Sequence, residues 1–212
     1  VVVNSGCANC AVGNQGYIDA KETAEIASNS LSIDLESIAV ASTGIIGVEL
    51  PMALMRKYIP KIELSKNDGP GFARSILTTD KRTKEIAVSF DYEGSEITVA
   101  GVAKGSGMIH PNMATMLSFI TSDISIDETT LREVLTLSVN KSFNQISVDG
   151  DQSTNDTVLA MANGEAQNKK ITSLEDASVF QEAMDQVCIF LAKEIAKDGE
   201  GNTSLIEAVI TG

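Results

Sequence analysis

The stretch that decides the fold runs from residue 86 to residue 103, IAVSFDYEGSEITVAGVA. Apolar and polar residues alternate from Val88 to Tyr92, which is the period of a half-buried strand. Glu93-Gly94 interrupts the alternation with a turn dipeptide, and the alternation resumes at Ile97. This stretch therefore predicts an antiparallel β-hairpin.

Helix-like and strand-like segments alternate on both sides of this hairpin. Helices are predicted over residues 18–31, 51–59, 72–77, 128–139 (capped by Asp127) and from a capping box at 173–176 to just before Asp198. Strands are predicted at residues 1–3, 38–41 and 115–121, the first two as buried strands, and residues 205–212 are also strand-like. Such a mixture, with at least one hairpin, indicates a layered α/β (α+β) domain instead of a strictly parallel sheet.

Composition and charge exclude several classes of protein. The chain has 212 residues, is 43% hydrophobic, and carries 29 acidic against 16 basic residues, a net charge of −13. This hydrophobic fraction is too high for a disordered chain, and no run approaches the roughly 18 apolar residues of a membrane span. Because a strongly acidic chain repels phosphate, we expect no nucleic-acid partner and no membrane association.

The ends of the sequence and its cysteines indicate whether it is an excerpt and in which compartment it is located. The chain does not start with Met, shows no signal-peptide pattern, and both ends are strand-like, so we expect an excerpt from a longer protein. Three cysteines are not a disulfide scaffold, which favours a reducing, cytoplasmic location. Cys7 and Cys10 form a CxxC, but without further ligands nearby we interpret them as small buried or half-buried thiols.

The sequence does not match the common nucleotide-binding, calcium-binding or catalytic-triad motifs. Residues 104–107, KGSG, match neither the phosphate-binding loop nor the dinucleotide fingerprint. Residues 149–156 resemble a calcium loop, but Thr154 and Ala160 stand where an EF-hand needs Gly and Glu. A turn whose side chains bond its own backbone explains that segment better. The sole histidine, His110, is more simply a packing or backbone-bonding residue than the base of a triad.

Residues 111–117, PNMATML, place a threonine after a turn and a small residue. The Thr115 hydroxyl is a weak nucleophile unless a base lies beside it. If the Ala114–Thr115 bond were cut, Thr115 would carry an α-amino group with an ordinary pKa of about 7.7–8.0, which can take the hydroxyl proton. On residue chemistry alone, however, a strand-opening β-branched residue is the favoured interpretation.

Other short blocks of the sequence also bear on the role of Thr115. In order along the chain stand VVNSG (2–6) with AN (8–9), STGIIG (42–47), LPM (50–52), TTD (78–80), AKGSGMI (103–109), PNMATML (111–117), SVDGDQSTND (147–156) and KDGEG (197–201). Together these blocks resemble the ornithine acetyltransferases (glutamate N-acetyltransferases) of arginine biosynthesis. The departures are small, since Cys7 stands where that family usually has Asn, and Asn202 precedes Thr203 where Ala-Thr is common.

The resemblance implies a self-processing acetyltransferase. The precursor would be cut between Ala114 and Thr115, after which Thr115 would take acetyl from N-acetylornithine and pass it to glutamate in a ping-pong cycle. Thr43 and Gly44 correspond to the oxyanion hole. The implied substrate-binding residues are Thr78, Lys104, Thr115 and Glu200. Charge suggests that Lys104 pairs with a substrate carboxylate and that Glu200 receives the side-chain amino group of ornithine.

The resemblance also implies an organisation. The fold would be an αββα sandwich, truncated at both ends, with residues 1–114 as the later part of an α chain and 115–212 as the early part of a β chain, together one unit. An α/β heterotetramer would follow cleavage. No metal or bound cofactor is implied, and acetyl-CoA is the co-substrate that bifunctional members use.

Two other classes of function stay open from the sequence. The first is a related N-terminal-nucleophile aminopeptidase, which shares self-cleavage and a similar fold. The second is an inactive fragment that lacks the rest of the pocket and only folds or associates.

Overall fold

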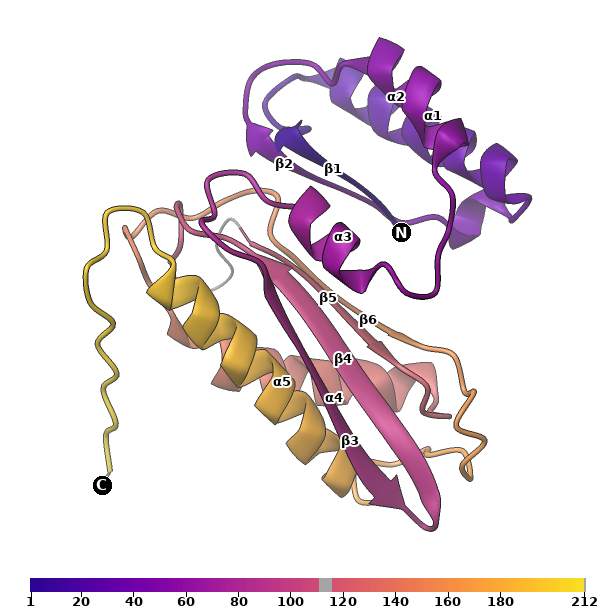
Figure 1. Cartoon of the computed structure of the whole chain (residues 1–212), viewed down its shortest axis with the longest axis vertical. Helices are drawn as coiled ribbons and strands as arrows, with labels where there is room; N and C mark the ends of the chain where they lie inside the picture. Colours follow the sequence, from indigo (N-terminus) through magenta and orange to yellow (C-terminus); the bar gives the residue numbers. More distant parts are fainter. Residues whose placement is uncertain (111–115, 212) are drawn as a thin grey trace. The chain divides into compact units, whose positions relative to one another are not determined.

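The computed structural model describes residues 1–110 and 116–211, which divide into two compact units, Val1–Thr78 and Thr79–Gly212. Figure 1 shows the elements of each unit along the chain. This boundary is not the predicted junction between residues 114 and 115. That junction is a predicted cut in the backbone, whereas the boundary at Thr78 separates two compact units, and the cut stays a prediction.

The first unit is built on a two-stranded parallel sheet. Strands β1 (Val2–Cys7) and β2 (Val40–Ile45) pair in register from Val2 with Val40 to Cys7 with Ile45. The helices are α1 (Asn14–Leu31), α2 (Met52–Tyr58) and α3 (Gly69–Ser75), with short 3-10 turns η1 (Leu35–Ser37) and η2 (Ile59–Lys61). In Figure 1, α1 and α2 lie together on one side of the two strands.

The second unit is a four-stranded sheet with two helices. Its strands are β3 (Lys84–Tyr92), β4 (Ser95–Lys104), β5 (Leu117–Ser122) and β6 (Thr157–Ala162), in the spatial order β3-β4-β5-β6. The first three are antiparallel and β5 pairs with β6 in parallel. Helices α4 (Glu128–Lys141) and α5 (Ser178–Lys197) and the 3-10 turn η3 (Phe143–Gln145) complete it (Figure 1).

The core of the second unit forms where α5 lies on the sheet. Phe180, Val187 and Leu191 of α5 are fully buried in one hydrophobic cluster with residues of β4 and β5. A Cβ added at Gly101 on β4 would stand 2.7 Å from Val187 Cγ1 and 2.9 Å from Leu191 Cδ1. Glycine at this position therefore lets the helix approach the strand closely.

The predicted hairpin is confirmed as β3 and β4. Its two-residue turn has positive φ at both positions, 51° at Glu93 and 88° at Gly94, as a hairpin turn of the primed type requires. The Asp127 cap is confirmed as well, because its carboxylate accepts the N–H groups of Thr129 and Thr130. The layered α/β class that these elements predicted is confirmed.

Several element boundaries were predicted wrongly. Helix α5 begins at Ser178, five residues after the predicted start, because Ser173 and Asp176 bond each other in a separate turn. Strand β6 was not predicted, and β2 begins only at Val40.

The predicted burial of the first strands and the strand at the end of the chain were also wrong. Val1 is 42% and Val40 is 40% exposed, because a sheet of two strands offers few neighbours within its own unit. Residues 205–211 are irregular, with Ile206 88% exposed, since no described strand pairs with them.

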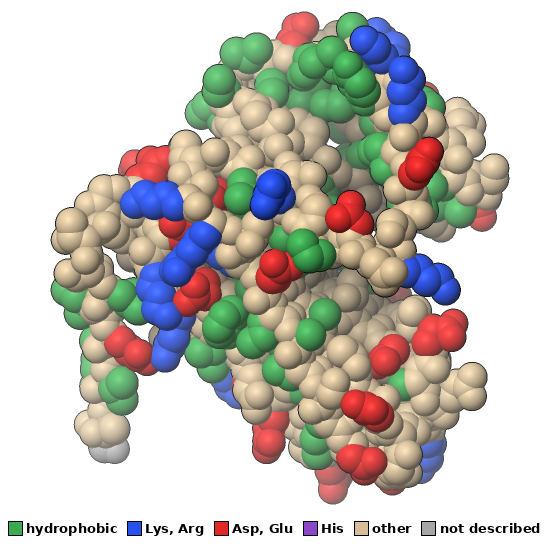
Figure 2. Space-filling model, viewed as in Figure 1, with side chains coloured by type: hydrophobic (Ala, Val, Ile, Leu, Met, Phe, Trp, Pro, Cys, Tyr) green, Lys and Arg blue, Asp and Glu red, His purple; other side chains and the backbone are tan. Residues whose placement is uncertain are grey.

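Hydrophobic side chains also reach the surface of the first unit, as the green area in the upper part of Figure 2 shows. Ile45, Leu54 and Ile62 are more than half exposed, at 67%, 51% and 62%.

None of the helices in residues 1–110 and 116–211 has the length and apolar composition of a membrane span.

Two phenylalanines on α5 allow a matched test of this core. Phe180 is fully buried and Phe190 is 40% exposed. We expect Phe180→Ala to lower the free energy of unfolding of the second unit by about 3–5 kcal/mol, because it leaves a cavity. Phe190→Ala should cost much less. Urea unfolding of both variants measures the difference, and equal losses would contradict the assignment of the core.

Candidate functional site

The predicted site residues fall into three groups. Thr43, Gly44 and Thr78 belong to the first unit, and Lys104 and Glu200 belong to the second. The predicted cleavage residues, Ala114 and Thr115, lie outside the described residues. The geometry of the predicted site is therefore described within each unit.

Thr43 and Gly44 lie in the second half of β2, beside β1. Thr43 is 2% exposed. Gly44 has φ +133°, and a Cβ added there would collide with the backbone of Gly6 and Cys7 on β1. This position therefore accepts only glycine. Thr78 is exposed and is the last residue of its unit.

A buried group of charges surrounds Lys104 at the end of β4. Lys84 Nζ lies 2.7 Å from Asp80 Oδ1 and 2.7 Å from Asp198 Oδ2, and the side chains of Lys84 and Asp80 are fully buried. Lys104 Nζ lies 3.7 Å from Asp80 Oδ2 and its side chain is 3% exposed. This ion pair of Lys104 therefore lies inside the unit and not on its surface.

Burial and neighbouring opposite charges shift the pKa values of Asp80 and Lys104 in opposite directions. Burial would raise the pKa of Asp80, but hydrogen bonds from Lys84 and from the Gly105 N–H, with the charge of Lys104, bring that pKa below its ordinary value. Burial lowers the pKa of Lys104, although Asp80 and Glu200 oppose this shift. The Lys104 ammonium is thus poorly solvated and suited to meet an anion.

Glu200 lies close to the same strand end. Its backbone N–H donates to the Ser106 carbonyl at 2.7 Å. A Cβ added at Gly107 would stand 2.8 Å from Glu200 Oε2, so that glycine makes room for the carboxylate. The structure therefore brings Lys104 and Glu200 together in one unit, although 95 residues separate them in the sequence.

Two aspartates hold the backbone on both sides of residues 111–115. Asp149 accepts the N–H groups of Met108 (2.5 Å) and Ile109 (2.8 Å). Asp156 accepts the N–H of Met116 at 2.8 Å. The interpretation of residues 149–156 as a backbone-bonding turn is confirmed, since Asp149 also accepts the Asp151 N–H.

The two aspartates differ in electrostatics. Burial alone would raise the pKa of Asp149, but its backbone N–H donors bring it below the ordinary value. Burial raises the pKa of Asp156 to about 7, against the opposing effects of the Met116 N–H and Lys104. A carboxyl group with such a pKa is a frequent sign of a functional site.

Sequence reasoning assigned no role to Asp80, Lys84, Asp156 and Asp198. All but Lys84 lie inside the blocks TTD, SVDGDQSTND and KDGEG that carry the family resemblance, so a signal for them was present. The signal for Lys84 was weaker, because a lysine at a strand end is usually solvated.

The remaining candidates carry little chemistry. Cys7 and Cys10 are half-buried thiols, as predicted, while burial raises the pKa of Cys188 to about 12. His110 lies with Nδ1 3.3 Å from Ser147 Oγ. In the described part of the chain, no three His, Cys, Asp or Glu side chains are grouped as metal ligands would be.

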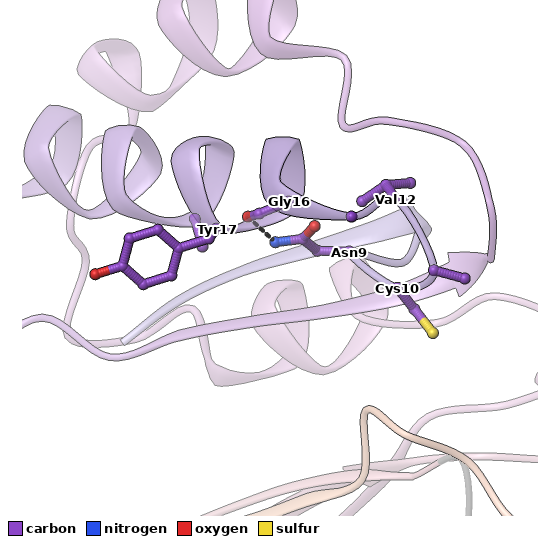
Figure 3. Close-up of a pocket in the computed structure, with 8 residues that line it drawn as sticks. Asn9, Cys10, Val12, Gly16 and Tyr17 are labelled. Carbon is purple, nitrogen blue, oxygen red and sulfur yellow. Dashed lines mark hydrogen bonds between the residues drawn. The ribbon is translucent and has the colours of Figure 1, made fainter.

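Figure 3 shows a surface hollow beside the start of α1. The Asn9 side chain crosses it and donates to the Gly16 carbonyl at 2.7 Å. A Cβ added at Gly16 would stand 2.5 Å from Asn9 Oδ1, so this glycine permits the contact. None of the predicted catalytic or substrate-binding residues that the structure describes lines the hollow.

Comparison with known proteins places these residues in a family. The model of the ArgJ family matches residues 1–212. The chain belongs to the ArgJ family. The predicted resemblance is therefore confirmed over the whole of the chain.

Individual relatives agree with this assignment. The arginine biosynthesis bifunctional protein ArgJ of Oceanobacillus iheyensis is 48% identical over 213 residues, which cover 100% of this chain and 52% of that protein. The protein of the same name from Lactococcus lactis is 47% identical, with 100% and 54% covered. The chain thus spans about half the length of the curated ArgJ relatives it matches.

A solved structure also matches. The crystal structure of the arginine biosynthesis bifunctional protein ArgJ from Bacillus halodurans has 40% sequence identity and a TM-score of 0.51, and the match covers 53% of this chain and 60% of that one. This similarity supports the layered α/β fold.

Lys84 provides a test of the buried charge group. We expect Lys84→Met to lower the free energy of unfolding by about 3–5 kcal/mol, because it leaves Asp80 and Asp198 buried without their cation. Lys193 makes an exposed pair with Glu207 at the same 2.7 Å, so Lys193→Met should cost less than about 1 kcal/mol. Urea unfolding that finds equal costs would contradict the importance of the buried pairs.

Proposed function

We propose that the chain is part of a self-processing acetyltransferase of arginine biosynthesis, which moves acetyl from N-acetylornithine to glutamate. Membership of the ArgJ family over all 212 residues supports this assignment. The structural observation that carries it is the meeting of Lys104 and Glu200, two predicted substrate groups of opposite charge, at one end of β4.

The reaction would begin with a cut in the chain itself. The Thr115 hydroxyl attacks the Ala114 carbonyl, and hydrolysis of the resulting ester leaves Thr115 with a free α-amino group. That amine then accepts the hydroxyl proton when Thr115 attacks the acetyl group of N-acetylornithine. Ornithine leaves, and glutamate takes the acetyl group from Thr115.

Thr43 and Gly44 would stabilise the oxyanion that forms in each attack. Preorganised donors of this kind typically lower the barrier by about 2.7–4 kcal/mol each. The strict requirement for glycine at position 44 agrees with a backbone that must keep one conformation.

Substrate recognition would rest on charge. The poorly solvated Lys104 ammonium would pair with the substrate carboxylate, and the Glu200 carboxylate would receive the side-chain ammonium of ornithine. Thr78 is the further residue for which the family resemblance implies substrate binding. None of these roles requires a metal or a bound cofactor.

The wider organisation follows from the same proposal. The cut would give an α chain ending at residue 114 and a β chain beginning at 115, assembled as a cytoplasmic α/β heterotetramer. The word "bifunctional" in the names of the relatives favours acetyl-CoA as a second acetyl donor. Formation of N-acetylglutamate from acetyl-CoA and glutamate would test that second activity.

Thr115→Ala tests the nucleophile. We expect an uncut chain without acetyl transfer, because the variant has no hydroxyl to form the ester. Intact-mass measurement follows the cut, and trapped acetyl-enzyme reports the transfer. Thr121→Ala, on the exposed side of β5, is the control and should be cut like the wild type. A cut Thr115→Ala chain would contradict the proposal, and turnover of peptides instead of N-acetylornithine would favour the aminopeptidase.

Glu200→Gln tests the substrate. It should raise the KM for N-acetylornithine about 10-fold or more, because a hydrogen bond between charged groups contributes about 1.5–3 kcal/mol. The KM for glutamate should change little, since glutamate has no side-chain ammonium. Glu207→Gln, on the exposed tail, is the matched control. Equal changes in both KM values would overturn this role of Glu200.

A further inference from the structure

The Asp156 carboxyl binds the backbone of the residue that follows the proposed nucleophile in the sequence. Its Oδ1 accepts the N–H of Met116, the residue that directly follows Thr115. The carbonyl of Met116 accepts the Thr157 N–H at 3.1 Å, so adjacent residues of one segment hold both polar groups of Met116. A half-buried acidic side chain is thereby bound to the backbone at Met116, two positions after Ala114 in the sequence.

The second oxygen of this carboxyl makes no hydrogen bond with the described residues. Asp156 Oδ2 is buried and has no hydrogen-bond partner there. An asparagine would accept the Met116 N–H equally well without bringing an ionisable group into a buried place. A purely structural role therefore does not explain why an aspartate stands at this position.

The chemistry of self-cleavage requires a base that the uncut chain does not yet have at Thr115. Before the cut, the Thr115 nitrogen belongs to a peptide bond, and its lone pair is delocalised into the carbonyl. It therefore cannot take the hydroxyl proton, although it can do so after the cut. The sole histidine, His110, lies with its Nδ1 against Ser147 Oγ.

We propose that Asp156 is the proton-transfer residue of the self-cleavage reaction, an inference that rests on the proposed function. The proton of the Thr115 hydroxyl passes to Asp156 as Oγ bonds to the Ala114 carbonyl carbon. When the C–N bond breaks, the proton passes from Asp156 to the departing Thr115 nitrogen. Water then hydrolyses the ester, which leaves a carboxylate on Ala114, restores the Thr115 hydroxyl and gives the released proton to the new α-amino group.

The reaction should then depend on pH through Asp156. Burial raises the pKa of its carboxyl to about 7, while the Met116 N–H from the start of β5 and the Lys104 charge from β4 favour the ionised form. Only the ionised carboxylate can take the hydroxyl proton. The rate of the cut should therefore rise as the pH passes through about 7 and become constant above it.

Asp156→Asn separates proton transfer from positioning, because it keeps the acceptor for the Met116 N–H. The cut is followed by intact mass after the denatured chain is refolded at pH values from about 5.5 to 9. We expect the variant to be cut at least about 100-fold more slowly and without the step near pH 7. Asp123→Asn is the matched control, since Asp123 Oδ1 accepts the Thr98 N–H at 2.8 Å beyond the other end of β5. Its pH profile should match that of the wild type.

A second measurement does not depend on cleavage. In the uncut Thr115→Ala chain, the NMR signal of the Met116 amide should titrate with a midpoint near pH 7, and the added Asp156→Asn substitution should abolish this titration. A Met116 amide that does not titrate in this range, or an Asp156→Asn variant cut with the wild-type profile, would overturn the inference. A wild-type chain that is never cut would instead contradict the proposed function itself.

Discussion

The ion pairs of the buried Lys84 with Asp80 and Asp198 are the interaction on which the polar end of the second unit depends. They join the start of β3 and the segment just before it to the end of α5, and 114 positions separate Lys84 from Asp198 in the sequence. A buried charge without its partner is strongly unfavourable, so these segments keep one arrangement. This arrangement also sets the positions of Lys104 and Glu200, because Lys104 contacts Asp80 and Glu200 lies two residues after Asp198.

Asp149 and Asp156 show how one short segment can produce two different carboxyl groups. Both accept backbone N–H groups beside residues 111–115. Asp149 has several such donors, which keep it ionised. Asp156 has one donor to one oxygen, and its second oxygen is buried without a hydrogen-bond partner among residues 1–110 and 116–211. The number of donors, set against burial, thus separates an anchor from a group that can exchange a proton near neutral pH.

Predictions from the sequence succeeded where the pattern was local and strong. The hairpin of β3 and β4 followed from period-two alternation and a turn dipeptide, and the start of α4 followed from its Asp127 cap. They failed where local signals compete. The turn at Ser173 resembles a helix start, and the continuous apolar run of β6 has no period that distinguishes a strand from a helix. For the candidate site, the sequence showed the short blocks that contain its residues, but it did not show that Asp80 is the partner of Lys104.

The sequence by itself determined the family, the α/β class and the residue types that the chemistry needs, because these depend on local pattern and on the order of short blocks. Only the tertiary structure decided that Lys104 is buried against Asp80 and that Glu200 reaches the same strand end. It also decided that Asp156 binds Met116 through Oδ1, while Oδ2 has no partner in the described part of the chain. The physical reason is that burial and charge pairing arise between segments far apart in the chain. They set the ionisation of these groups, and local sequence does not record them.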